Sequence, residues 1–146
     1  MKKSVLLICC IAAACASNSS KSSDKGGLSA TTGDWSASLS SRNNSGITGT
    51  AGVQSAVIGS GMRISIRGAT SGAAHPWHVH AGPCSASGGI MGSPSSYPAL
   101  TIAADGTATA NVTINAPLTE GNTYSVNVHR SASDMGTIVA CGELKN

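Results

Sequence analysis

Residues 62–68 read MRISIRG, a stretch in which apolar and polar side chains alternate strictly. An alternation with period two is typical of a β-strand that buries one face and exposes the other. Similar short segments, rich in Val, Ile and Thr and separated by Gly, Asn, Asp and Pro, lie on both sides of it. We expect strands at residues 35–39, 47–58, 62–68, 77–81, 99–103, 107–114, 123–130 and 137–144.

These eight segments, with no convincing helix between them, predict an all-β domain. Only 10% of the residues are charged, Phe is absent and Gly occurs 18 times, which suits strands joined by Gly-rich turns better than amphipathic helices. Eight short strands at this spacing predict an eight-stranded Greek-key β-sandwich or flattened barrel. Asp105-Gly106 predicts a tight type I′ hairpin, and residues 82–98 predict a structured loop over one end of the barrel.

The N-terminal segment MKKSVLLICCIAAAC is typical of a bacterial export signal. Its apolar run, residues 5–14, is too short to span a bilayer as a mature helix. Residues 11–15 look like a lipobox in which Cys15 receives the lipid, and a plain secretory signal cut at the same Ala-rich stretch is the alternative. Both interpretations place the domain outside the cytoplasm. Ala16 and Ser17 favour an anchor at the outer membrane of the bacterial cell envelope, facing the periplasm or the surface.

Three parts are therefore expected: a signal peptide at 1–15, a disordered Ser-rich tether at 16–33 and a folded domain at 34–146. Nine basic and six acidic residues give a net charge of +3, and removal of Lys2 and Lys3 leaves seven against six, or +1. No nucleic-acid footprint is visible at that balance. The expected contact with a membrane is through the N-terminal lipid, and the oligomeric state is not indicated.

Two cysteines, Cys84 and Cys141, remain outside the signal segment. In an oxidising compartment we expect them to form a disulfide, which the chain-entropy treatment credits with about 4 kcal/mol. A metal-binding thiol pair is the alternative, but no CxxC spacing supports it.

The four histidines are unevenly placed: three lie in residues 75–80, HPWHVH, and His129 is far along the chain. On a strand, His78 and His80 project from one face while Trp77 and Val79 point to the other, which we assign to the core. A third imidazole from His129 would complete a three-nitrogen site that suits copper or zinc. His75 has the opposite parity to His78, and we expect it to pack or to hydrogen-bond behind the ligands.

The flanking residues carry a resemblance to the copper/zinc superoxide dismutase family. Residues 75–80 resemble the family's strand H-G-F-H-V-H, residues 126–129 are similar to the strand that ends in the last copper histidine, and residues 136–144, GTIVACGEL, resemble the closing strand with its A-C-G signature. The resemblance covers residues 47–144. It implies a barrel of the superoxide dismutase type, one copper ion on His78, His80 and His129, and superoxide as the substrate.

The chain also departs from the family pattern. No histidine lies between His80 and His129, so the zinc ligands and the bridging histidine are missing and no zinc is expected. The family's active-site arginine aligns with Ile138, which leaves Arg130 as the nearby candidate for guiding an anion. Met91 and Tyr97 are candidates for a weak fourth contact, or they simply pack the loop.

Three functions stay open at this point. The first is a copper-only superoxide dismutase that converts superoxide to dioxygen and hydrogen peroxide. The second is a non-enzymatic module that binds or sequesters copper, and the third is a metal-free structural domain. The sequence does not decide whether the copper site is catalytic.

Overall fold

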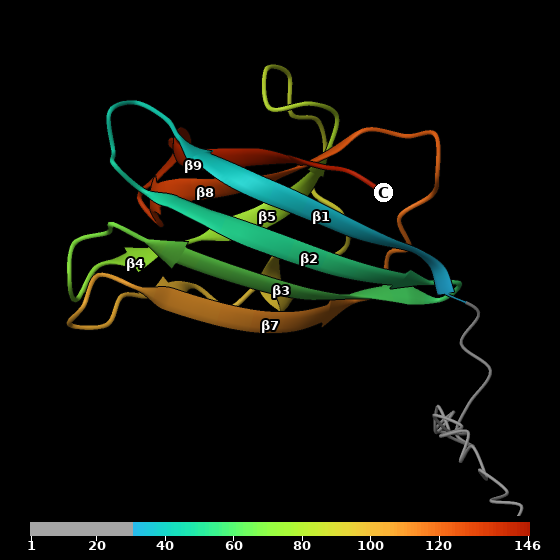
Figure 1. Cartoon of the computed structure of the whole chain (residues 1–146), viewed down its shortest axis with the longest axis horizontal. Helices are drawn as coiled ribbons and strands as arrows, with labels where there is room; N and C mark the ends of the chain where they lie inside the picture. The colour runs from blue at the N-terminus through green and yellow to red at the C-terminus, as the bar shows by residue number, and fades with distance from the viewer. Residues whose placement is uncertain (1–30) are drawn as a thin grey trace, which may run out of the picture.

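The computed structural model describes residues 31–146; the predicted signal peptide, Cys15 and residues 16–30 of the predicted tether lie outside it. The described part is nearly all β, which confirms the all-β part of the predicted fold (Figure 1). Its strands form a seven-stranded sheet and a two-stranded ladder in place of the predicted eight-stranded arrangement. Its one helical element is the short 3₁₀ turn η1, and no described helix is long and apolar enough to cross a membrane. The strands are β1 (Thr31–Ser41), β2 (Thr48–Ala56), β3 (Gly59–Arg67), β4 (Ala74–His75), β5 (Trp77–Ala81), β6 (Leu100–Thr101), β7 (Ala108–Ile114), β8 (Tyr124–Ser131) and β9 (Asp134–Leu144), with η1 at Pro94–Ser96.

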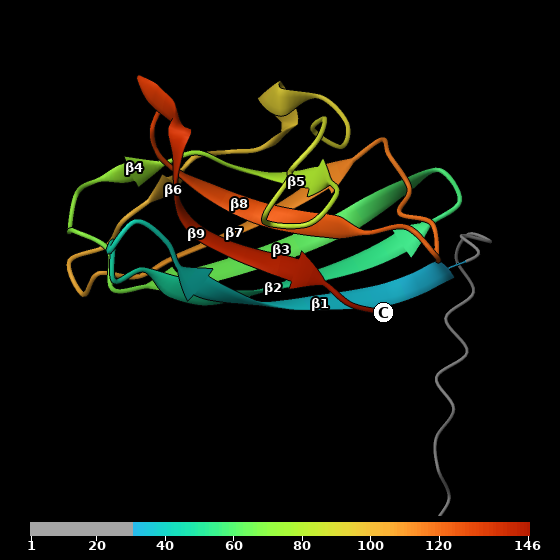
Figure 2. The ribbon, with the colours of Figure 1, turned by 90° about the horizontal axis from the view of Figure 1, so that it is seen from above.

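Seven strands form one antiparallel sheet in the order β5-β8-β9-β1-β2-β3-β7. The sheet curls into a half-barrel with β5 and β7 at its two edges (Figure 2). The short strands β4 and β6 pair with each other, His75 opposite Leu100. Because β4 leads directly into β5 and β6 packs against β7, this small ladder lies between the two edges of the large sheet.

The core fills the concave side of the curled sheet. In β3, the alternation read from the sequence corresponds to burial, because Met62, Ile64 and Ile66 are buried and Arg63 and Arg67 are exposed. Large side chains from the other strands and loops complete it: Trp35, Leu39, Val53, Trp77, Val79, Leu100, Ile114, Leu118, Tyr124, Val126, Val128 and Leu144. The removal of this apolar surface from water is the main favourable contribution to folding.

Several predicted strands have other limits in the structure. The stretch 47–58 is not one strand to its end, because Ala56 pairs with Gly59 and the residues between them, Val57 and Ile58, form a turn. Both are β-branched, so composition alone favours a strand there. The stretch 99–103 yields only the two residues of β6, since it meets only the two-residue strand β4 in a ladder. β1 begins at Thr31, four residues before the predicted strand.

The predicted type I′ hairpin at Asp105-Gly106 is wrong. A type I′ turn needs positive φ at both central residues, but only Gly106 has it, with φ of 80°. The Gly106 amide donates to the Ala103 carbonyl at 3.0 Å, and Asp105 Oδ1 accepts from the amide and hydroxyl of Thr107. The side chain of Asp105 therefore stabilises a turn closed by a glycine, and the flanking strands β6 and β7 belong to different sheets.

The segment after β5 is structured, as predicted, and folds back along the free edge of that strand. The Met91 amide donates to the Val79 carbonyl at 2.8 Å, and Ala81 exchanges backbone hydrogen bonds with Gly88 and Gly89. The predicted disulfide is confirmed: Cys84 in this loop is bonded to Cys141 in β9, with a Cα–Cα distance of 6.0 Å. The loop thus covers an otherwise unpaired sheet edge.

Candidate metal centre

Strand pairing brings the distant His129 to the two histidines of β5. β5 and β8 are antiparallel neighbours in which His78 lies opposite Asn127. His129 is two residues beyond Asn127, so it lies on the same face as His78, on the diagonal. The His129 amide donates to the Pro76 carbonyl at 2.8 Å, which fixes this end of the register.

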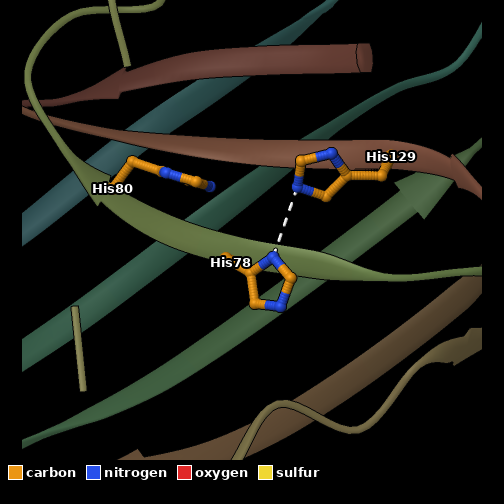
Figure 3. A group of neighbouring side chains, drawn as sticks. All are labelled: His78, His80 and His129. Atoms are coloured by element: carbon orange, nitrogen blue, oxygen red, sulfur yellow. Dashed lines mark hydrogen bonds between the residues drawn. The ribbon is translucent and has the colours of Figure 1, made fainter. Parts of the chain in front are cut away.

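The three side chains converge from the two strands (Figure 3). One nitrogen from each of His78, His80 and His129 lies within 4.8 Å of the other two. His78 Nδ1 and His129 Nε2 are 3.3 Å apart, and two nitrogen ligands of a tetrahedral ion with bonds of about 2.0 Å are separated by about 3.3 Å. The three residues could therefore hold a metal ion.

Backbone carbonyls orient two of the rings. His80 Nδ1 donates to the Gly88 carbonyl at 2.9 Å, and His129 Nδ1 donates to the Met135 carbonyl at 2.7 Å. Each proton is thereby placed on Nδ1, so Nε2 of both rings carries a lone pair. The lone pair of His129 Nε2 faces His78 Nδ1 within hydrogen-bond distance, as the dashed line in Figure 3 shows. A carbonyl behind each ring is the usual support of a metal-binding histidine.

The hydrogen bonding of His80 Nε2 indicates whether a metal ion would fit the cluster. Within residues 31–146, His80 Nε2 is buried and has no hydrogen-bond partner. A buried polar atom without a partner costs about 1–3 kcal/mol. Since the Gly88 carbonyl fixes the tautomer, His80 Nε2 is a hydrogen-bond acceptor without a donor. A metal ion held by His78, His80 and His129 would satisfy it.

The electrostatics of the cluster favour neutral rings. Burial, and then the nearby His129 and His80, lower the pKa of His78 to about 4. Burial also lowers the pKa of His129, although its hydrogen bond to the Met135 carbonyl acts in the opposite direction. At neutral pH these two imidazoles are uncharged, which is the form that binds metals.

Tyr97 packs against the site from the loop. Its ring lies edge-to-face on His78, with centroids 5.2 Å apart, and on Trp77 at 5.0 Å. Its hydroxyl donates to the Met91 carbonyl at 2.6 Å, and burial raises the pKa of Tyr97 to about 12. Tyr97 is therefore a neutral hydrogen-bond donor that orders the loop beside His78. Met91 is half-buried and packs against the core.

The remaining candidates lie around the cluster. His75 is buried, and its Nδ1 donates to the His129 carbonyl at 3.0 Å, so it contacts the backbone of a cluster residue. Arg130 lies 3.5 Å from Asp134 in an ion pair whose side chains are both exposed. Ile138 lies opposite His129 in the β8–β9 ladder. The position aligned with the family arginine is therefore beside the cluster and apolar.

A buried polar network supports the loop that orients His80. Asn127, which lies opposite His78, donates to Ser87 Oγ at 2.9 Å. Ser87 Oγ also lies within hydrogen-bond distance of Ser125 Oγ, at 3.3 Å. Because Ser87 immediately precedes Gly88, the network links β8 to the carbonyl that fixes the His80 ring.

The sequence did not indicate these supports. Gly88 and Met135 act through backbone carbonyls, which carry no residue-type signal, and Ser87 stands in no recognisable motif. The chain matches no protein-family model, and no curated protein matches it.

Proposed function

We propose that this chain is an extracytoplasmic lipoprotein, anchored through Cys15, that binds one copper ion through His78, His80 and His129. The observation that carries the proposal is the buried, unpartnered Nε2 of His80 within a cluster of three imidazoles. A cluster built only of imidazoles suits copper or zinc, and the resemblance of residues 75–80 to a copper-binding strand favours copper.

The path of the chain supports a barrel of the copper/zinc superoxide dismutase type. After β3 the chain crosses to the opposite edge as β5, returns to form β7 beside β3, and crosses again to form β8 beside β5. Long connections that return a strand beside an earlier one are characteristic of Greek-key folds. The disulfide between the loop after β5 and the last strand agrees with the same resemblance.

The proposed reaction is superoxide dismutation. Copper supplies one-electron chemistry, so that one superoxide is oxidised to dioxygen and a second, with two protons, is reduced to hydrogen peroxide. The protein's part would be to hold the ion with three imidazole rings. Backbone carbonyls orient the rings of His80 and His129, and Tyr97 packs against that of His78. With three protein ligands, a bound ion would keep a coordination position open to a small anion.

Metal analysis paired with a superoxide assay tests the proposal. We expect one copper per chain and superoxide turnover that depends on it. In His129→Gln we expect weakened copper affinity and loss of turnover. Arg130→Gln is the matched control, because Arg130 is the next residue of β8 and its exposed side chain pairs with Asp134. It should leave copper binding unchanged. If the wild-type protein binds no copper, the metal-free structural role stands instead.

A second candidate function is copper storage or delivery without turnover. It is favoured by the apolar Ile138 opposite His129 and by the engagement of Arg130 with Asp134, because neither then offers a cation to draw superoxide in. Electrostatic steering raises association rates by at least about tenfold where it operates. A fully copper-loaded protein that is inactive in the superoxide assay would favour storage over catalysis.

A further inference from the structure

The turn between β2 and β3 exposes two large apolar side chains. Val57 is 59% exposed and Ile58 is 77% exposed, the two highest values among the exposed large hydrophobic residues of the described chain. A hollow of about 520 Å³ lies beside Ile58, and polar side chains line it together with Ala56 and Ile114. The exposed apolar surface of this tip is therefore mainly that of Val57 and Ile58.

The turn itself does not require these residues. Two-residue hairpin turns prefer Asn, Asp and Gly, because the favoured turn types need positive φ. Among the described non-glycine residues only Asn43 and Asn44 have positive φ, so Val57 and Ile58 keep ordinary φ at the tip. No charged residue occurs between residues 54 and 62. Two β-branched apolar residues in a charge-free tip are thus unfavourable for the turn and for solubility.

The tip lies beside the start of the described chain. Thr31 pairs with Ala56, the residue immediately before Val57. Figure 1 shows β1 beginning next to the turn between β2 and β3, and Figure 2 shows the β8–β9 hairpin near the opposite end of the domain. Fifteen residues, 16–30, separate Cys15 from Thr31, and fifteen residues span at most about 50 Å. A lipid on Cys15 would hold this end of the domain close to a bilayer.

We propose that Val57 and Ile58 insert into the interfacial region of the bilayer that holds the lipid anchor. The inference rests on the proposed anchoring through Cys15. The surface recognised is a zwitterionic lipid surface, because the tip carries no cation and the neighbouring loop, which is joined to Ser55 and Ser60 by hydrogen bonds, carries the exposed Glu120. Insertion of the tip would turn the β8–β9 hairpin, and His129 with it, away from the membrane.

Two side chains alone make a weak contact. Burying one Val and one Ile in a bilayer shifts partitioning by on the order of tenfold, which is too little to hold an unanchored protein at a membrane. The tip therefore sets the orientation of the domain relative to the bilayer. Once the lipid anchor holds the domain near the membrane, a preference on the order of tenfold is enough to decide which end of the domain faces the bilayer.

A fluorescent probe at the tip tests this orientation. The full-length lipidated protein is reconstituted in vesicles of phosphatidylcholine and phosphatidylethanolamine, with an environment-sensitive fluorophore on Ile58→Cys or, as the matched control, on Ser133→Cys in the exposed β8–β9 turn. We expect blue-shifted emission at position 58 that is quenched by spin-labelled lipids, and water-like, unquenched emission at position 133. A vesicle-bound protein whose two positions are equally unquenched would refute the proposal.

A second measurement separates the tip from the anchor. In the full chain carrying Cys15→Ser, flotation with the same vesicles should be weak and should fall on the order of tenfold further when Val57→Ser and Ile58→Ser are added. If the full-length lipidated protein does not float, the proposed anchor is wrong. The difference in flotation between Cys15→Ser with and without the two serine substitutions still tests the tip. A blue shift at position 58 that grows with protein concentration without vesicles would assign the tip to contact with a second copy, against the proposal.

Discussion

Removing the disulfide should cost the domain about 4 kcal/mol of stability without abolishing its metal site. The bridge joins residues separated by 57 positions, and the loss of loop-closure entropy for a loop of that length amounts to about 4 kcal/mol at 25 °C. The perturbation is the double substitution Cys84→Ala and Cys141→Ala. The loop that carries Gly88 keeps its hydrogen bonds to Val79 and Ala81, so the His80 ring should keep its orientation in the folded protein.

Urea denaturation of the metal-free protein is the assay. With a slope of about 1.5 kcal/mol per molar urea, the expected loss lowers the midpoint by about 2 to 3 M. Ser85→Ala, an exposed change in the same loop, is the control and should alter stability by less than about 0.5 kcal/mol. A loss below about 1 kcal/mol for the double variant, or a copper site that disappears while the protein remains folded, would refute this reasoning.

Three further changes probe the surroundings of the site and the core. Tyr97→Phe removes the hydrogen bond to the Met91 carbonyl and should cost about 1 kcal/mol; an unchanged melting temperature would count against that bond. Ser55→Ala leaves the fully buried Leu118 amide and carbonyl without the Ser55 hydroxyl, and a loss of about 2 kcal/mol in chemical denaturation is expected; a neutral change would contradict it. Because the pKa of His78 is lowered to about 4 from 6.5, the unfolded metal-free chain binds more protons below pH 6.5. Stability should therefore fall by about 2 kcal/mol from pH 7 to 5, whereas a midpoint in urea that stays constant would be inconsistent.

The sequence predicted the features that depend on residue type and spacing. The parity of residues 77–80 placed Trp77 and Val79 in the core, and both are buried. The strand at residues 77–81 has the predicted limits. The pairing of Cys84 with Cys141 followed from the absence of other cysteines outside the signal segment, and the bond is present.

Features that depend on backbone geometry could not be predicted from the sequence. The turn at Val57 and Ile58 was hidden because β-branched residues favour strands, and its position is set by the pairing of Ala56 with Gly59. The turn type at Asp105 depends on a side-chain hydrogen bond to Thr107 that competes with the expected backbone geometry. The carbonyls that orient the rings of His80 and His129 belong to a glycine and a methionine, residue types that give no signal for this role.

The central claim is that three imidazoles converge on one copper ion. Electron paramagnetic resonance of the protein loaded with one equivalent of Cu(II) tests it directly, by counting the nitrogens coupled to the metal. We predict three imidazole nitrogens in the wild-type protein and in Arg130→Gln, and two with weakened affinity in His129→Gln. A His129→Gln protein whose spectrum and copper affinity equal those of the wild type would contradict the account.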